Sequence, residues 1–322
     1  MTLTWGPLRI DEAGLLTELL GAVEKSEPTG EHMSEQDVRE DLTQPGTDLP
    51  TQTLAARAQG HLVAYAMVAV RDAAEPVHLL RAEVVVHPGH RDDAVRERLL
   101  SWLAGAARTA HEGTFPGAPL EIHVMAHENR PWTAEALAAA GYERRRTFVE
   151  MRAALDANLP APAPLPDDLR LVTHEPAHAE ATLAARNEVF AGHWGSTHVT
   201  AEGWQHRVLG SEAFRPDLSF LLLTPGRERV EAFVLSAHFA ADTAATGVRE
   251  LYVSHVGTRE GLRGRGVGSA LLGHTLAAAR DAGFRRSSLS VDVDNATRAL
   301  GVYERCGYVV DSTSHDYVLS LA

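Results

Sequence analysis

Residues 249–268 read RELYVSHVGTREGLRGRGVG, and this stretch decides the fold of the second half of the chain. Its first part, Arg249–Thr258, reads as a strand. The glycine-rich turn at 263–268 follows, and apolar residues then recur at helical spacing from Val267 until Gly283 ends the helix. A strand that passes through such a turn into a helix presents backbone N–H groups and the positive end of the helix dipole. The stretch therefore predicts a site for an anion such as a diphosphate.

The same order of elements recurs in the first half of the chain. Strands are predicted at 82–87 and 120–125, with a helix at 97–110 between them and a second helix from Asn129 to Gly141. In the second half, the strand 288–293 follows the glycine-turn helix, and Asn295 opens a short helix that ends at Gly307. The offset from Asn129 to Gly141 equals that from Asn295 to Gly307, which indicates a diverged internal repeat.

A proline-rich segment separates the halves, with Pro160, Pro162, Pro164 and Pro166 at alternate positions. Alternating proline resists helix and sheet and favours an extended, semi-rigid spacer. We expect a first domain at 1–152, a linker at 153–168 and a second domain at 169–322.

Two signatures in the second half carry a family resemblance. Arg263, Gly266 and Gly268 resemble motif A of the GNAT N-acetyltransferase superfamily, and the spacing from Asn295 through Tyr303 to Gly307-Tyr308 is similar to its second signature. The resemblance implies two tandem α/β domains, each a twisted mixed sheet flanked by helices. A tandem chain with a degenerate first copy resembles the mycothiol synthases and related two-domain acetyltransferases.

The resemblance also implies acetyl-CoA as co-substrate. The backbone of Val256, Gly257 and Thr258 would then hold the pantetheine arm and the thioester. A glycine near a strand end independently suggests a bulge or a close backbone approach, although a plain strand end remains open. The remaining residues expected to bind acetyl-CoA are Arg263, Gly264, Arg265, Gly266, Val267, Gly268, Ser269, Asn295 and Tyr303.

Tyr303 is the expected general acid. Attack of an amine on a thioester expels a thiolate, and a tyrosine hydroxyl, with an ordinary pKa of roughly 10, is protonated at neutral pH and can protonate that sulfur. The family uses a tyrosine at this position in that way. The alternative is that Tyr303 packs as an ordinary helix aromatic.

The base stays open between Glu250, His255 and a water chain. Glu250 begins the strand, where partial burial would raise a carboxyl pKa toward a useful range, but it could equally be a solvated strand end. His255 titrates near neutrality but is more often a packed residue on a two-sided strand. Asp292 and Asp294 are weaker candidates.

The first half departs from the motif where the chemistry needs it. Asp92 and Asp93 place negative charge where a diphosphate would lie, and Ala94 and Arg96 replace glycines. Leu137 stands where the tyrosine belongs. We expect this half to be structural or to form one wall of the acceptor site.

The net charge of −13 is uneven along the chain. Residues 169–322 hold 17 acidic and 15 basic side chains, whereas residues 1–168 hold 26 and 15. An acidic first half argues against nucleic acid and could attract a cationic acceptor, although it also serves solubility. No apolar run reaches the length of a membrane span, and no signal peptide is visible.

Other sequence features narrow the chemistry. The single cysteine, Cys306, excludes an intrachain disulfide and fits a cytoplasmic protein, where it is expected to be a small buried residue. The seventeen histidines show no metal-ligand spacing, so we expect no metal site. His193 and Trp194 could line the acceptor site or form a structural turn.

We therefore expect an acetyl-CoA-dependent N-acetyltransferase that acts on a small-molecule amine by direct transfer in a ternary complex. The acceptor could be cationic or resemble a mycothiol precursor. The rival reading is a non-catalytic acyl-CoA-binding or sensor protein, which would need motif A but not Tyr303. The oligomeric state is left open by the sequence.

Overall fold

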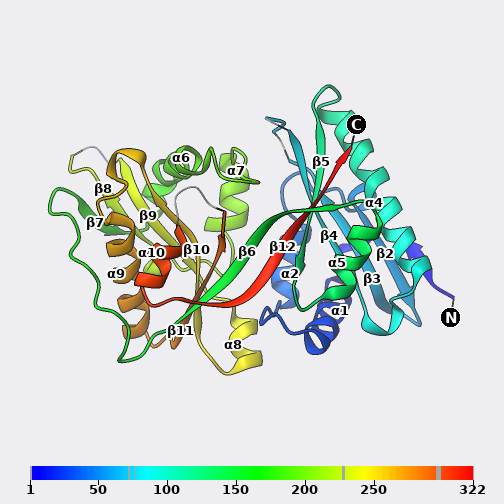
Figure 1. Ribbon diagram of the computed structural model, residues 1–322, viewed down its shortest axis with the longest axis horizontal. Helices are drawn as coiled ribbons and strands as arrows, with labels where there is room; N and C mark the ends of the chain where they lie inside the picture. Colours follow the sequence, from blue (N-terminus) through cyan, green and yellow to red (C-terminus); the bar gives the residue numbers. More distant parts are fainter. Residues whose placement is uncertain (1, 72, 76, 227–228, 295–298, 322) are drawn as a thin grey trace. The chain divides into compact units, whose positions relative to one another are not determined.

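The chain forms two compact units. The computed structural model describes residues 2–71, 73–75, 77–226, 229–294 and 299–321 (Figure 1). One unit comprises Met1–Thr147 together with Ser312–Ala322, and the other comprises Phe148–Asp311.

Both units contain strands and helices. The strands are β1 (Thr4–Gly6), β2 (Thr53–Ala58), β3 (His61–Ala69), β4 (His78–Val86), β5 (Leu120–His127), β6 (Glu143–Ala154), β7 (Arg170–Thr173), β8 (Phe220–Leu223), β9 (Val230–Ala237), β10 (Glu250–Thr258), β11 (Arg286–Asp292) and β12 (Val309–Leu321). The α-helices are α1 (Ala13–Ser26), α2 (Glu35–Leu42), α3 (Leu49–Gln52), α4 (Asp93–Thr114), α5 (Pro131–Ala139), α6 (Ala179–Phe190), α7 (Ala201–Trp204), α8 (Ala240–Thr246), α9 (Val267–Asp281) and α10 (Ala299–Arg305).

The strand order is the same in both units. In the first unit it runs β1-β2-β3-β4-β5-β12, and in the second β7-β8-β9-β10-β11-β6. The parallel pairs are β4 with β5 and β10 with β11, which occupy equivalent places in the two units. The neighbouring strands within each unit otherwise pair antiparallel. This shared topology supports the predicted internal repeat.

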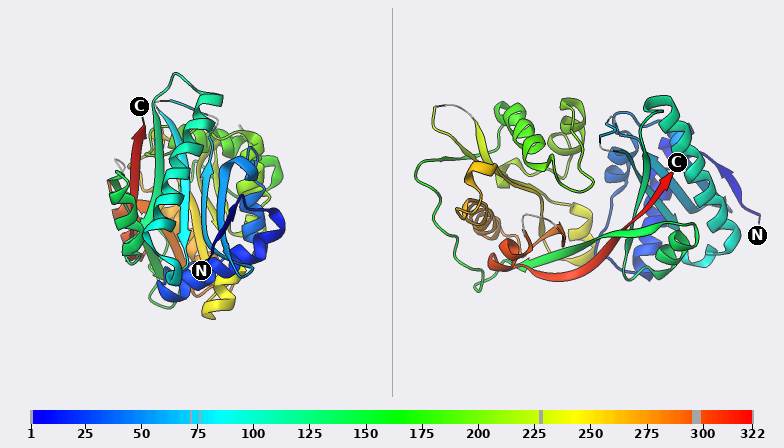
Figure 2. Two further views of the ribbon diagram at one scale, coloured as in Figure 1. Left: turned by 90° about the vertical axis from the view of Figure 1, so that its right-hand side faces the viewer. Right: turned by 45° about the horizontal axis from the view of Figure 1, so that its top comes forward.

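Helices cover both faces of each sheet, which confirms the expected mixed α/β fold (Figures 1 and 2). In the second unit, α9 packs on one face through Leu271 and Leu276, while α6 and α7 pack on the other through Val189 and Trp204. The first unit repeats this with α4 on one face and α1 on the other. In the described part of the chain, no helix is both long and apolar enough to cross a membrane.

Two strands pass from one unit into the other. β6 begins in the first unit, and its residues 148–154 pair with β11 of the second. β12 begins in the second unit, and its residues 314–321 pair with β5 of the first. The last strand of each sheet is therefore supplied by a segment that starts in the other unit. The expected domains at 1–152 and 169–322, with a linker at 153–168, stay a prediction.

The proline-rich segment packs on the second unit. Leu159 and Leu165 lie against the core that α9 covers. A Cβ added at Gly273, in α9, would lie 3.1 Å from the Cα of Pro162, and one added at Gly307, just after α10, would lie 3.0 Å from the Cδ of Pro160. Glycine at these positions lets the proline segment approach closely. The segment is therefore packed against the second unit and is not a free spacer.

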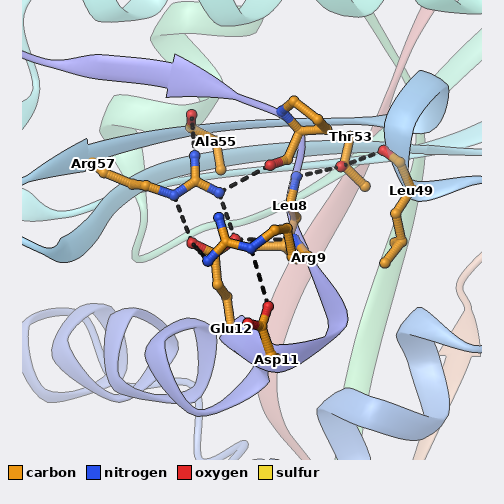
Figure 3. A network of polar contacts seen from close by, with 9 residues as sticks. Leu8, Arg9, Asp11, Glu12, Leu49, Thr53, Ala55 and Arg57 are labelled. Carbon is orange, nitrogen blue, oxygen red and sulfur yellow. Dashed lines mark hydrogen bonds and ion pairs between the residues drawn. The ribbon is translucent and has the colours of Figure 1, made fainter.

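A buried ion pair joins the N-terminal segment of the first unit to β2 (Figure 3). Glu12 is 3% exposed and accepts hydrogen bonds from Arg57 on β2 at 2.6 and 2.5 Å. Arg57 also donates to the carbonyl oxygen of Pro7, just after β1. The Arg57 hydrogen bond is the main reason why the pKa of Glu12 is lowered.

Candidate functional site

The two parallel strands of the second unit separate beyond their first residues. Pairing joins Glu250–Tyr252 of β10 to Arg286–Ser288 of β11, although both strands continue further. The register of β10 against β9 shifts between Val253 and His255, as in a β-bulge. The site described below lies around the part of β10 that follows this shift.

The glycine turn leads into α9 as the sequence predicts. Gly264 and Gly266 have φ of +75° and +78°, conformations that favour glycine, and Gly266 is the N-cap residue without a side-chain cap. The first intrahelical bond is made by Ala270 N–H to the carbonyl oxygen of Gly266, at 3.0 Å. The N–H groups of residues 267–269 precede it and have no partner within the helix.

Two arginines flank these N–H groups. Arg263 Nε donates to the carbonyl oxygen of Thr258 at 3.1 Å, which ties the turn to the end of β10. Arg265 lies 3.6 Å from Asp168, but both side chains are more than half exposed, so the pairing is weak. The N–H donors and the two guanidinium groups suit a diphosphate, and the two glycines of positive φ form the turn that presents these donors.

In the equivalent turn of the first unit, carboxylates already occupy the helix N-terminus and the arginine. The Asp92 carboxylate accepts from Val95 N–H at 2.9 Å and caps α4. Arg91, which corresponds to Arg263, is held by both carboxylate oxygens of Glu27, at 2.7 and 2.6 Å. The aspartate that the sequence marks as repulsive to a diphosphate thus also occupies the helix end itself.

Gly257 makes room for a buried aromatic ring, a packing role that the sequence did not indicate, and its expected contact with the pantetheine arm stays a prediction. A Cβ at this position would lie 2.2 Å from a ring carbon of Phe233, which is fully buried on β9. Its missing side chain makes room for that ring, and the register shift lies earlier, between Val253 and His255. Neighbouring Thr258 contacts the start of α9, because a Cβ at Gly268 would lie 3.2 Å from its hydroxyl oxygen.

Tyr303 lies on α10 and packs beside Tyr308, with ring centroids 6.1 Å apart. Burial, followed by the influence of Cys306, raises the pKa of Tyr303 to about 12. Its hydroxyl is therefore protonated at neutral pH, as a proton donor must be. Cys306 is buried and its thiol contacts the carbonyl oxygen of Ser269 at 3.7 Å, which links α10 to the first turn of α9. Asn295 lies outside the described residues.

Glu250 is engaged in several polar contacts. Its carboxylate pairs with Arg286, lies 3.6 Å from Arg152 Nε, and accepts from the Ser288 hydroxyl at 2.7 Å. The carboxylate oxygens are thus already engaged by neighbouring side chains. These contacts weigh against Glu250 as the base. Asp292 instead closes a turn, because one of its oxygens accepts from the Asp294 N–H at 2.9 Å.

His255 has a defined hydrogen-bonding state. The Ser254 hydroxyl donates its only hydrogen to the carbonyl oxygen of Leu235 at 3.1 Å. The tautomer with its hydrogen on Nδ1 satisfies both contacts, because His255 Nδ1 then donates to the same hydroxyl oxygen, 3.1 Å away. Burial, and secondarily Arg186, lowers the pKa of His255 to about 4, so the ring is neutral at pH 7. Its Nε2 then carries a lone pair that can accept a hydrogen bond or a proton.

Aromatic side chains from α6 and α7 surround this imidazole. The rings of Phe190 and Trp204 stand edge-on to it, with centroids 5.9 and 5.6 Å away. His193 packs against Phe190 at 4.7 Å, and burial lowers its pKa. The tryptophan beside His255 is thus Trp204, which the sequence pattern did not indicate. Its contact depends on the register shift in β10, and the sequence carries no evident signal for it.

In the described residues, no group of three or more histidine, cysteine, aspartate and glutamate side chains is placed to hold a metal ion.

Comparisons with known proteins agree with this architecture. Residues 181–308 match the model of the acetyltransferase (GNAT) family. The chain is 33% identical over 235 residues to a mycothiol acetyltransferase of Thermobispora bispora, with 73% of this chain and 74% of the relative covered. It is 31% identical over 304 residues to that of Geodermatophilus obscurus, covering 93% and 92%.

Solved structures resemble the whole chain. A GCN5-related N-acetyltransferase from Sphaerobacter thermophilus superposes with a TM-score of 0.76 at 22% identity, covering 99% of this chain and 95% of the other. A tandem GNAT protein from the clavulanic acid biosynthesis pathway gives 0.71 at 15% identity, covering 99% and 98%. At these identities the likeness concerns the fold.

Proposed function

The chain belongs to the acetyltransferase (GNAT) family and is an N-acetyltransferase, and on this premise we propose that its second unit transfers the acetyl group of acetyl-CoA to a small-molecule amine. The observation that carries the proposal is the uncapped start of α9, with Arg263 beside it and Tyr303 tied to it through Cys306. The capped turn of the first unit supports one acetyl-CoA site per chain.

The proposed transfer is direct, in a ternary complex. The N–H groups of residues 267–269 and the two arginines would hold the diphosphate. The amine nitrogen attacks the thioester carbonyl carbon, the C–S bond breaks, and the Tyr303 hydroxyl gives its proton to the departing sulfur. The proton lost by the amine goes to a base or to a water chain. Of the two candidate bases, His255 offers a ring nitrogen with a lowered pKa, and Glu250 is held in ion pairs.

The acceptor is proposed from the relatives and from charge. Relatives named as mycothiol acetyltransferases make an amine that resembles a mycothiol precursor the first compound to test. The acidic first half keeps a cationic amine, such as a polyamine, among the candidates. If the protein were only an acyl-CoA sensor, it would bind acetyl-CoA and acetylate neither.

Tyr303→Phe tests the chemistry. We expect turnover on the best acceptor to fall by roughly 10²–10⁴-fold, because the departing thiolate loses its proton donor, while the dissociation constant for acetyl-CoA stays unchanged. Turnover is followed by thiol release and binding by calorimetry. Tyr317→Phe is the matched control, because this tyrosine is partly buried against the core of the first unit. Turnover within about twofold of wild type would show that Tyr303 only packs.

Two further substitutions separate the candidate bases. His255→Gln should lower kcat if the imidazole accepts the proton. Glu250→Gln should mainly lower the free energy of unfolding, because Arg286 loses its ion pair and Arg152 keeps only its pair with Asp311. If Glu250→Gln lowers kcat and His255→Gln does not, Glu250 is the base.

A further inference from the structure

The helix that carries Tyr303 is short and has little core of its own. α10 has seven residues, all of them described, and none of these is fully buried. A helix of this length is marginal by itself, because most helical stability in proteins comes from tertiary packing. The position of Tyr303 therefore depends on the contacts that hold the end of α10.

The turn after α10 is tied directly to Tyr303. The carbonyl oxygen of Tyr303 accepts from the N–H groups of Cys306 and Tyr308, at 2.9 and 3.1 Å. Gly307 lies between these two residues and has a φ of +93°. Tyr308 is 1% exposed, and its hydroxyl lies 2.8 Å from that of Ser287 on β11. A displacement of this turn would therefore be passed on to Tyr303 through its two backbone hydrogen bonds.

The proline segment, residues 159–166, packs on the same turn. A Cβ added at Gly307 would lie 3.0 and 3.5 Å from Cδ and Cγ of Pro160, and 3.9 Å from Cδ1 of Leu159. Two residues further along, Pro162 approaches α9 in the same way, since a Cβ at Gly273 would lie 3.1 Å from its Cα and 3.2 Å from its Cβ. The segment runs beside α9 on its way from β6 to β7 (Figure 1), and it thus contacts both helices of the proposed site.

The course of the proline segment is fixed along its length. Just before it, the Leu155 N–H donates to the carbonyl oxygen of Arg285 at 2.9 Å, beside the start of β11. Leu159 and Leu165 are partly buried against the core that α9 covers. Each proline also fixes its own φ, which makes the chain between these points semi-rigid. The segment can therefore hold the turn at Gly307 in one place.

We propose that the proline segment is a positioning element for the proposed acetyl transfer, because the contact of Pro160 with Gly307 holds α10 against α9 and keeps the Tyr303 hydroxyl in place. Pro160 is a positioning residue that acts through the turn and through Tyr303. The inference rests on the proposed function, in which Tyr303 is the general acid.

The single cysteine of the chain reports the position of this turn without any acceptor. Cys306 is 7% exposed, and its thiol lies 3.7 Å from the carbonyl oxygen of Ser269 in α9. Pro160→Ala removes the two ring carbons that face Gly307. We expect iodoacetamide to label Cys306 roughly fivefold to tenfold faster in this variant, because the turn opens more often.

Pro164→Ala is the matched control for this labelling. It makes the same change in the same segment, at a ring that is not among those approaching Gly273 or Gly307. Its labelling rate should equal that of the wild type. Leu159→Ala is a second test of the contact and should also speed labelling. Unchanged labelling in both Pro160→Ala and Leu159→Ala overturns the proposal, and so does an equal increase in Pro164→Ala.

Turnover is the second readout. Pro160→Ala should lower kcat on the best acceptor by roughly tenfold, because the proton donor is less well placed, and should leave the dissociation constant for acetyl-CoA unchanged. In a Tyr303→Phe background, the same substitution should have no further effect on kcat, since it acts through the hydroxyl. An unchanged kcat in Pro160→Ala, or an equal loss in the Tyr303→Phe background, overturns the positioning role.

Labelling of Cys306 does not require turnover. If labelling responds as expected but the wild type acetylates no amine, the proposed function fails and the contact that holds α10 stands. If amines are acetylated but Pro160→Ala and Leu159→Ala match the wild type in labelling and kcat, only the positioning role fails.

Discussion

Alanine at position 257 tests whether this glycine serves packing or the ligand. The new Cβ would lie 2.2, 2.4 and 2.9 Å from carbons of the Phe233 ring, which is completely buried. Ordinary contact begins at 3.4 Å, so the ring or the strand has to move by roughly 1.2 Å. Overpacking of a buried site costs about 1–3 kcal/mol, and we expect Gly257→Ala to lower the free energy of unfolding by that amount.

Urea denaturation and calorimetric binding of acetyl-CoA form the assay. Gly261→Ala is the matched control, because its Cβ would meet nothing within 4 Å. Adding Phe233→Leu to the alanine variant should recover part of the loss, since it removes the ring that the Cβ meets. A Gly257→Ala protein with unchanged unfolding and weakened acetyl-CoA binding would refute this reasoning and restore the expected approach of the ligand to the backbone.

Three more outcomes are expected. Gly266→Asp should abolish binding at the proposed acetyl-CoA site in calorimetry, whereas Gly247→Asp, with a similar φ of +72° before the other end of β10, should keep it. Gly273→Ala should loosen the proline segment and speed its cleavage by protease, whereas Gly105→Ala, in open space on α4, should stabilise by roughly 0.5–1 kcal/mol. The pKa of His255 is lowered to about 4 from 6.5 by burial, so the unfolded chain takes up this proton first as the pH falls. Stability should therefore be complete above pH 6.5 and decline toward pH 4, and His255→Gln should flatten the decline in urea titrations at stepped pH.

Local patterns were enough to predict the elements of the proposed diphosphate site. The strand, glycine turn and helix follow from residue types that act within one turn or one strand, and the structure places β10 and α9 within a residue of the expected bounds at 249–258 and 267–282. The closed turn of the first unit was foreseen as charge repulsion, but the capping role of Asp92 was not. Capping depends on the backbone geometry at a helix start, which composition alone does not determine.

The acceptor side could not be predicted from sequence. The register shift before His255 turns this side chain toward α6 and α7, and such a shift depends on the pairing of β10 with β9. Val253 and Val256 pack with α9, a spacing that a regular strand would not give to one face. The alternation of residues therefore gave no indication that His255 would meet Trp204. The pairing of β6 with β11 and of β12 with β5 could not be predicted either, because strand pairing joins residues that are far apart in the sequence.

Because β6 and β12 each run from one unit into the other, the order of translation affects when each unit can be completed. Residues 312–321 are translated after all other described residues of the first unit. The first unit therefore leaves the ribosome without β12, its sixth strand, and has to wait for this strand until the second unit has been made. Until then β5 is an open sheet edge, which invites pairing with other nascent chains. Slowing translation between 148 and 311 should lengthen this exposure and increase aggregation. The second unit receives β6 before its own strands are synthesised, so the hazard during translation falls on the half that lacks the intact motif.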